Sequence, residues 1–473
     1  MGQTSSLEIV TGALIRQPGV SDWQIHRRTQ RSAQLFLIGA EIEARRLVST
    51  ERLQTRIYND HPPRTPGGEE GGIHAGRPGG GTPREAVLTA GLMRGETRRV
   101  LLAEEIADPA RLAQALEEAV FIAGLTDNQP FSLPKPPAGF YPDVETVDSA
   151  LIASDEARLA ALDGLRERLL AAVDAEPGIH LSSAELFATA SEITLRNSRG
   201  IDLESSETDL LCDLVLIASD GNQFAEYHRM PQRRRLADMS IETIVERAAR
   251  YARDSLRAST PPTHEGPVVI SGEALVDLFS PLIFHSSARA AYQSSSRLTP
   301  GASISGEQEL QGDGLTFISN ALLPYGLSSA PASEEGLPAE RLVIIQDHQL
   351  QARWAEQRYA DYLGIRPTGG FANIEIPAGA HTLQELLHSD GPVYQLVAFS
   401  WLNPDDLTGD FVAEIKLGYR LEQEQRTPIK GGSLGGNLFE ALGNTRLSRE
   451  TQFTGGYTGP EALRFERLTI SGE

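Results

Sequence analysis

The stretch AQLFLIGAEIEARRLVSTERLQTRIY, residues 33–58, decides how the fold begins. Residues 33–38 and 41–48 have the residue types and pattern of β-strands, and Gly39 between them is a turn residue, so we expect two strands joined by a tight turn. Residues 53–58 have the same character and predict a third strand. The chain is therefore expected to start with neighbouring β-strands.

The rest of the first half is expected to mix helices with strands. Residues 61–83 are dense in glycine and proline and predict a long mobile loop. Asp108-Pro109 starts a helix well, because a capping side chain precedes a proline at the first helical position, and Ser154 caps a second helix. Further elements are expected as strands near 184–195, 210–218 and 223–228 and a helix at 240–256. This pattern predicts an N-terminal α/β domain over residues 1–258.

The pattern of apolar and turn residues changes after Pro261-Pro262, which marks the expected domain boundary. Beyond it, short apolar runs are separated by turn residues, and Asp347-His348 lies between two runs like the tip of a hairpin. These features predict a β-rich domain over residues 263–473, built mainly from antiparallel strands. The fold class expected is α+β, an N-terminal α/β domain followed by a β-rich, mainly antiparallel C-terminal domain.

The bulk properties favour a cytoplasmic protein that binds neither nucleic acid nor membrane. A formal net charge of -21 repels nucleic acid, and the run Arg233-Arg234-Arg235, which lacks interleaved aromatic residues, is expected to be a solvated loop. We find neither an apolar run of about 18 residues, as a transmembrane helix needs, nor a secretory signal. The single cysteine, Cys212, lies in an apolar run, so we expect it in a buried strand of a protein from a reducing cytosol.

The ten histidines do not predict a zinc site in this chain. Two imidazoles of a zinc hydrolase share one helix face, but the sequence holds neither His-Glu-x-x-His nor His-Glu-x-x-x-His. His264-Glu265 lies next to two prolines and is expected in a linker. His381 and His388 are seven residues apart on an expected helix, too far to reach one metal easily, so surface or capping roles are favoured.

Two other kinds of site are also disfavoured. Ser433 lies in Gly-Gly-Ser-Leu-Gly, which matches a nucleophile elbow, but Pro428 weakens the strand before it and the last histidine is upstream, so a structural glycine loop is expected. Gly79-Gly80-Gly81 and Gly312-Asp313-Gly314 lack the other residues of phosphate-binding motifs and are expected to be turns. The pairs Glu334-Glu335 and Asp405-Asp406 are typical of an acidic surface, and adjacency alone does not make an acid and base pair.

Several segments, taken in order, resemble the TldD/PmbA family. In the second half they are the strand at Gly266–Ser271, the turn at Gly326–Ser329, the segment Glu335–Pro338, the turn Pro367–Gly370, the stretch Asn403–Phe411 and the stretch Gly435–Leu438. In the first half, Trp23–His26 and Arg196–Gly200 also fit. Each piece is short, and their common order and spacing make the match specific.

The resemblance points to one of the two kinds of subunit in this family. TldD-like chains carry His-Glu-x-x-x-His after the strand that enters the C-terminal domain, and a cysteine near the C-terminus, and these three side chains hold the catalytic metal. Residues 271–279 of this chain contain no histidine, and residues 454–459 contain no cysteine. The resemblance therefore implies a TldE/PmbA-like subunit with no metal ligands, no catalytic residues and no cofactor of its own, whose TldD-like partner carries zinc.

A function follows from the resemblance as an expectation. The complex would cleave unfolded peptides, and this chain would supply part of the chamber wall, with Glu335, Gly336, Gly369 and Gly370 as candidates for substrate-lining residues. The same glycines also suit ordinary turns. Two other functions stay open: a homodimeric peptide-binding or scaffold protein without protease activity, and an independent hydrolase with an unrecognised site.

Overall fold

The computed structural model describes residues 5–59, 95–221, 223–423 and 425–473. The expected loop at 61–83, including Gly79-Gly80-Gly81, lies outside these residues. The helices within them are α1 (Ser6–Arg16), α2 (Ala103–Ala107), α3 (Pro109–Ala123), α4 (Ser149–Ile152), α5 (Asp155–Asp174), α6 (Ile241–Arg257), α7 (Ala274–Leu278), α8 (Ser280–His285), α9 (Ala288–Tyr292), α10 (Gln357–Leu363), α11 (Leu383–Leu386) and α12 (Leu438–Leu442), with a 3-10 turn at Leu236–Asp238. No helix within the described ranges is long and apolar enough to span a membrane.

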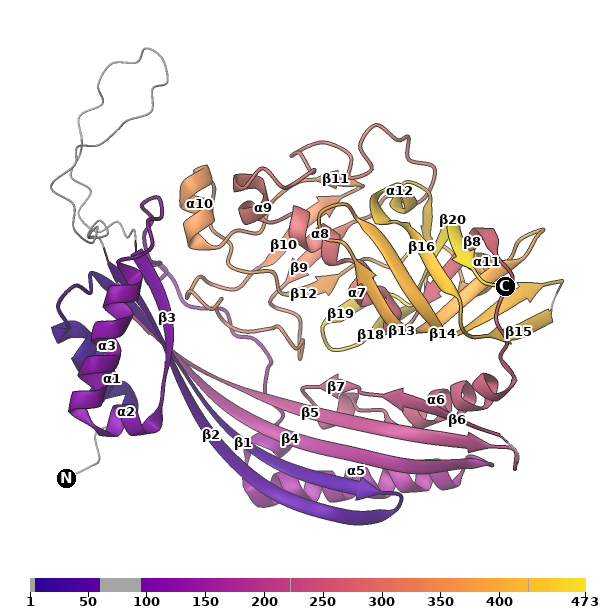
Figure 1. Ribbon diagram of the computed structural model, residues 1–473, viewed down its shortest axis with the longest axis horizontal. Helices are drawn as coiled ribbons and strands as arrows, with labels where there is room; N and C mark the ends of the chain where they lie inside the picture. Colours follow the sequence, from indigo (N-terminus) through magenta and orange to yellow (C-terminus); the bar gives the residue numbers. More distant parts are fainter. Residues whose placement is uncertain (1–4, 60–94, 222, 424) are drawn as a thin grey trace.

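The first half of the chain forms a long curved sheet (Figure 1). Its strands lie in the order β3-β2-β1-β4-β5-β6, β7 also pairs with β5, and every pairing is antiparallel. The turn at Gly39 is confirmed, but residues 53–58 are not a separate strand, because β2 continues without interruption through the polar residues before them. The strands are β1 (Asp22–Ile38), β2 (Glu41–Asn59), β3 (Gly95–Leu101), β4 (Ile179–Asn197), β5 (Asp202–Ser219), β6 (Phe224–Arg229) and β7 (Gln232–Arg233).

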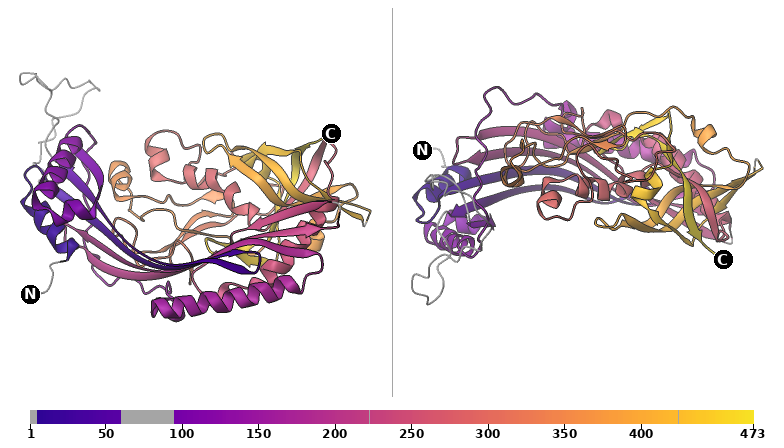
Figure 2. Two further views of the ribbon diagram at one scale, coloured as in Figure 1. Left: turned by 60° about the horizontal axis from the view of Figure 1, so that its bottom comes forward. Right: turned by 90° about the horizontal axis from the view of Figure 1, so that it is seen from above.

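Helices cover the convex face of this sheet, and the second domain lies on its concave side (Figure 2). Ala33, Leu35 and Leu37 of β1 are buried in one core with α5 and α6, whereas Trp23 and Ile25 are buried in another with α1 and α3. Because side chains alternate along a strand, the residues between these positions face the concave side. Cys212 of β5 is fully buried in the α5–α6 core, as expected.

The second domain contains a closed barrel and a second sheet that share one core. In the barrel, β13, β8, β20, β16 and β14 follow one another, and pairing of β13 with β14 closes the ring. The second sheet has the order β11-β10-β9-β12-β19-β18. The strands are β8 (His264–Ser271), β9 (Phe317–Asn320), β10 (Arg341–Gln346), β11 (Gln349–Leu350), β12 (Asn373–Glu375), β13 (Val393–Pro404), β14 (Asp410–Glu422), β15 (Gln425–Ile429), β16 (Ser433–Asn437), β17 (Thr445–Leu447), β18 (Thr451–Phe453), β19 (Tyr457–Pro460) and β20 (Ala462–Ser471).

The expected α+β class with a β-rich, mainly antiparallel second half is confirmed. Asp347-His348 is the tip of the β10–β11 hairpin, with positive φ angles of 46° and 68°. Pro261-Pro262 lies in the connection between α6 and β8.

Three local expectations are wrong. His264-Glu265 begins β8 instead of lying in a linker. His381 and His388 flank the single-turn helix α11, which starts at the capping box of Thr382 and Glu385 and is too short to carry both histidines. Ser433 starts β16, between β14 and β20, so the expected glycine loop is limited to the turn at Gly431-Gly432. A nucleophile elbow places the serine in a sharp turn between a strand and a helix, whereas Ser433 is the first residue of a strand.

Candidate functional site

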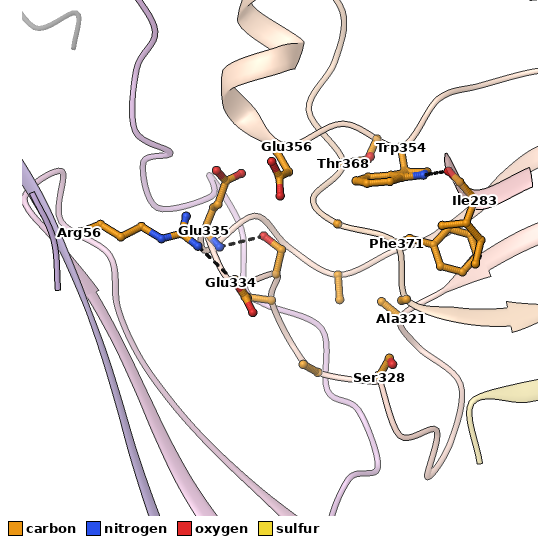
Figure 3. A pocket seen from close by; sticks show the side chains of 16 residues that line it. Arg56, Ile283, Ala321, Ser328, Glu334, Glu335, Trp354, Glu356, Thr368 and Phe371 are labelled. Atoms are coloured by element: carbon orange, nitrogen blue, oxygen red, sulfur yellow. Dashed lines mark hydrogen bonds and ion pairs between the residues drawn. The ribbon is translucent and has the colours of Figure 1, made fainter. Parts of the chain in front are cut away.

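A cavity of about 520 Å³ lies in the second domain, next to the concave face of the first sheet (Figure 3). One of its walls is the segment 328–335, and a second cavity of about 270 Å³ lies on the other side of this segment, against the first sheet. Arg56 of β2 reaches the larger cavity from the first sheet. The site is therefore built where the two halves of the chain meet.

A tight turn presents two adjacent carboxylates at the cavity. The Ser333 amide donates to the Leu337 carbonyl and the Gly336 amide to the Ser333 carbonyl, which closes the turn. Gly336 has a φ of +90°, and a Cβ there would lie 2.5 Å from Ile201 Cδ1 in the β4–β5 connection. Only glycine combines this conformation with this close contact.

Two of the four candidate lining residues line the cavity and two do not. Glu335 and Gly370 line the cavity. Gly336 and Gly369 lie behind it, and a Cβ at Gly369, which has a φ of +85°, would lie 2.6 Å from Ser333 Cβ. Both glycines thus serve the packing that shapes the wall, and whether any of the four contacts a substrate stays a prediction.

Glu334 connects the turn to the first sheet. Its carboxylate lies 3.2 Å from the Arg56 guanidinium, and its carbonyl accepts a hydrogen bond of 2.5 Å from Gln24 Nε2. The Arg56 side chain is only 9% exposed, so its charge needs this partner. The expectation that Glu334-Glu335 lies on an acidic surface holds for Glu334, whose side chain is 78% exposed, but is wrong for Glu335, which burial desolvates.

Glu335 is the carboxyl group with the most perturbed environment in the site. Burial raises its pKa from the usual 4.5 to about 7. A hydrogen bond of 2.8 Å from the Gln357 amide lowers this pKa, whereas the nearby Glu356 carboxylate raises it. Arg56 and Arg98 lower it further, but burial prevails.

The far wall of the cavity is apolar. Trp354 and Phe371 line it together with Ile283, and alanine and serine side chains form much of the rest. Trp354 Nε1 donates to the Ile283 carbonyl at 2.8 Å, and the Phe371 ring stacks on Phe317 with centroids 5.7 Å apart. These contacts fix both rings, so the cavity has an acidic side and an aromatic side.

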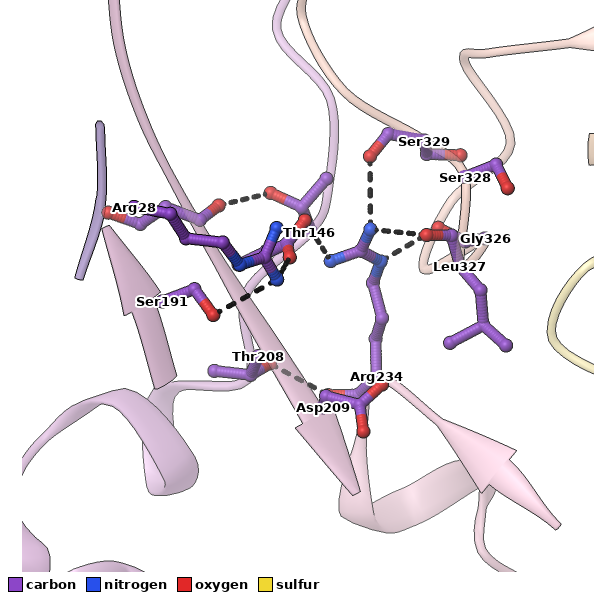
Figure 4. A network of polar contacts seen from close by, with 12 residues as sticks. Arg28, Thr146, Ser191, Thr208, Asp209, Arg234, Gly326, Leu327, Ser328 and Ser329 are labelled. Carbon is purple, nitrogen blue, oxygen red and sulfur yellow. Dashed lines mark hydrogen bonds and ion pairs between the residues drawn. The ribbon is translucent and has the colours of Figure 1, made fainter. Parts of the chain in front are cut away.

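Arg234 holds the segment 326–329 of the second domain onto the first sheet (Figure 4). Its guanidinium donates to the carbonyls of Gly326 and Leu327, both at 2.7 Å, and pairs with Glu207 of β5 at 3.0 Å. Arg28 of β1 pairs with the same Glu207. The expectation that the arginine run is a solvated loop is therefore wrong for Arg234, which is 4% exposed.

The other two arginines of the run are also engaged within the chain. Arg233 is 9% exposed and lies over the Phe453 ring, whereas Arg235 pairs with Asp238 at 2.7 Å and lies over Tyr325. The run thus connects the two domains instead of forming a free basic patch.

Residues 271–279 and 454–459, the two segments in which the resemblance led us to look for metal ligands, meet in this structure. Gly272 follows β8, its carbonyl accepts a hydrogen bond of 2.9 Å from Gln452 Nε2, and the Phe279 and Tyr457 rings are stacked with centroids 6.4 Å apart. A groove of about 400 Å³ lies beside α7 and is lined by Glu273, Asp277 and His228, among others.

The residues beside α7 do not fit a zinc ion. Glu273 is paired with the Arg229 guanidinium at 2.6 Å, and His228 Nε2 lies 2.7 Å from Asp213. Within the described residues, no group of three or more histidine, cysteine, aspartate or glutamate side chains could hold a metal. Neutral imidazole and thiolate ligands, which zinc prefers, are missing at the positions that meet here.

Sequence reasoning missed most of the groups that build the site. Arg56, Trp354, Glu356 and Phe371 carry no motif, and Arg56 is 278 residues away from its partner Glu334. The sequence offered one signal, for Arg234 alone. The run Arg233-Arg234-Arg235 lacks aromatic neighbours, and such a run can bind backbone carbonyls as well as lie in solvent.

Removal of the Arg234 charge is expected to weaken the joint between the domains. Arg234→Met leaves the carbonyls of residues 326 and 327 without their donor, so we expect the free energy of unfolding to fall by about 3 kcal/mol. Arg235→Met is the matched control, because its partially exposed ion pair contributes less than about 1 kcal/mol. Urea unfolding measures both, and equal losses would contradict the role of Arg234.

Glu335→Gln is expected to stabilise the protein at alkaline pH. A carboxyl whose pKa is raised in the folded state binds its proton more tightly there, so the wild type loses stability as pH rises from about 4.5 to about 7. Each pKa unit corresponds to about 1.4 kcal/mol, and we expect a gain of at least about 1 kcal/mol at about pH 8 and none at about pH 4. Thermal unfolding across pH, with Glu117→Gln at an exposed position of α3 as control, tests this, and a gain independent of pH would refute it.

Known proteins are similar to this chain in sequence or in fold. TldE from Thermococcus kodakarensis has the same fold, with a TM-score of 0.77 and 17% identity over 99% of this chain and all of that one. A metalloprotease of Synechocystis sp. is 27% identical over 364 residues, 71% of this chain and 74% of that protein. An uncharacterized protein of Methanocaldococcus jannaschii is 27% identical over 255 residues, which are 52% of this chain and only 59% of that protein.

Two family models match consecutive parts of the chain. The PmbA/TldA metallopeptidase central domain matches residues 147–256, and the C-terminal domain of the same family matches residues 263–472. Together they cover most of the sequence, including the segment 328–335, the apolar wall of the cavity and the groove beside α7. The chain belongs to the TldD/PmbA metallopeptidase family.

Proposed function

We propose that this chain is the non-metal-binding subunit of a TldD/TldE-type metallopeptidase complex that cleaves unfolded peptides. The observation that carries the proposal is the composition of the α7 region. Residues 271–279, which follow the strand that enters the second domain, contain no histidine, and the carboxylate of Glu273 is paired with Arg229. A guanidinium thus supplies the positive charge next to this carboxylate.

The chemistry of peptide hydrolysis explains why such a chain needs a partner. The reaction requires an activated water and a stabilised oxyanion, and in a metallopeptidase both depend on the metal. The TldD-like subunit would carry that zinc. This chain would contribute the cavity between its domains, which would hold part of an extended substrate.

The names of similar proteins support the proposal at two levels. The relative from Synechocystis sp. is named a metalloprotease, and the protein from Thermococcus kodakarensis is named TldE. The first name supports proteolysis as the general activity, and the second supports the assignment to the non-metal-binding branch. A cavity of about 520 Å³ with one aromatic side and a few polar groups is of a size that suits a small ligand or part of a peptide.

Reconstitution tests the proposal directly. The purified chain is expected to retain no stoichiometric zinc through dialysis and to leave a disordered peptide uncleaved, because it supplies no ligand set for the metal. Addition of a TldD-like subunit from the same cell should produce cleavage that a chelator abolishes. Elemental analysis, gel filtration of the mixture and a peptide cleavage assay provide the three measurements.

Each alternative predicts a different outcome of this experiment. Cleavage by this chain alone that resists the chelator would replace the proposal by an independent hydrolase. Failure to bind any TldD-like protein, together with a stable homodimer, would replace it by a scaffold or peptide-binding protein. A stable complex is expected to bury more than roughly 1,000 Å² and to survive gel filtration.

A further inference from the structure

The charges around the larger cavity are unevenly paired. Of its three carboxylates, Glu334 is neutralised by Arg56 at 3.2 Å. Glu335 accepts one hydrogen bond, from the uncharged Gln357 amide, and within the described residues neither Glu335 nor Glu356 forms an ion pair. Two carboxylates without counter-ions therefore border the same cavity (Figure 3).

These two carboxylates come from segments that the fold holds in fixed positions. Glu335 lies on the turn that Gly336 packs against Ile201, and Glu356 is the N-cap residue of α10. The Gln357 amide that binds Glu335 belongs to the first residue of the same helix, so the turn and α10 are joined at this point. The repulsion between the two carboxylates is thus built into the structure, and a cation between them would relieve it.

The opposite side of the cavity suits an aliphatic chain or the face of a cation. The Trp354 and Phe371 rings are held by the contacts described above, and the small side chains of Ala321, Ala330 and Ala372 leave room beside them. Lysine and arginine combine an apolar stem with a charged end and can fill a cavity that has an apolar and an acidic side. An aromatic wall adds attraction for the cation itself.

We propose that this cavity binds a cationic group of an extended peptide, with the charge between Glu335 and Glu356 and the adjoining apolar atoms against Trp354 and Phe371. The proposal rests on the proposed function, because it names the kind of substrate that the chain holds. The cationic group can come from a lysine or arginine side chain or from a free N-terminal amine. The net charge of -21 favours the approach of basic peptides in either case.

Binding of a cation is coupled to the ionisation of Glu335. Burial raises the pKa of this carboxyl to about 7, so a substantial fraction is protonated at neutral pH in the free protein. A bound cation favours the carboxylate and lowers that pKa. Affinity for a cationic peptide should therefore increase as pH rises through about 7, against the opposing charges of Arg56 and Arg98 and with the support of Glu356.

The test compares disordered peptides that differ at a single residue. A fluorescent peptide with one central lysine and an acetylated N-terminus is matched by a peptide with norleucine in place of lysine, and by a norleucine peptide with a free N-terminal amine. Fluorescence anisotropy gives the three dissociation constants, first with this chain alone and then with the TldD-like subunit added in chelator, which prevents cleavage. We expect at least one cationic peptide to bind about tenfold more tightly than the neutral one.

Variants assign the preference to the cavity. Glu335→Gln and Glu356→Gln should each reduce the preference for the cationic peptide several-fold with little effect on the neutral peptide, and Glu335→Gln should also abolish the rise in affinity near pH 7. Glu117→Gln on α3 is the matched control and should keep both properties. Thermal unfolding of each variant shows that the fold is retained.

The outcomes separate this inference from the proposed function. Preference for the lysine peptide identifies a side chain as the ligand, and preference for the free amine identifies the N-terminus. Equal binding of all three peptides, or a preference that survives both variants, overturns the inference and leaves the proposed function in place. Absence of binding to any peptide, alone and in the complex, overturns both.

Discussion

The contact between the Arg234 guanidinium and the carbonyls of residues 326 and 327 determines how the rest of the site is arranged. A buried guanidinium needs several acceptors, and the second domain provides them from its backbone while the first sheet provides Glu207. This contact fixes the segment that continues into the carboxylate turn. The cavity therefore depends on an interaction that belongs to neither domain alone.

The curvature of the first sheet gives this joint its geometry. Helices cover the convex face, and polar side chains such as Gln24 and Arg28 lie on the concave face. The segment 328–335 lies between this face and the larger cavity. Polar groups on β1 and β2 thus bind the backbone and the side chain of Glu334, and Glu335 is left to face the cavity.

The α7 groove and the larger cavity differ in how their charges are balanced. In the groove, Arg229 neutralises Glu273 in an ion pair within the chain. In the cavity, Glu335 and Glu356 have no such partner among the described residues. This difference is why we propose a cationic ligand for the cavity.

The sequence alone predicted many of the helices and strands, the α+β class, the family and the lack of histidine in residues 271–279, because each of these depends on neighbouring residues or on short ordered motifs. Residues 53–58 were wrongly predicted to be a separate strand, because the polar residues 49–52 of β2 give no sign that the strand continues through them. The tertiary structure decided the burial of Arg234, the pairing of Arg56 with Glu334 and the raised pKa of Glu335. These properties arise from contacts between residues that are far apart in the chain, and no local pattern encodes the desolvation of a side chain by a distant segment.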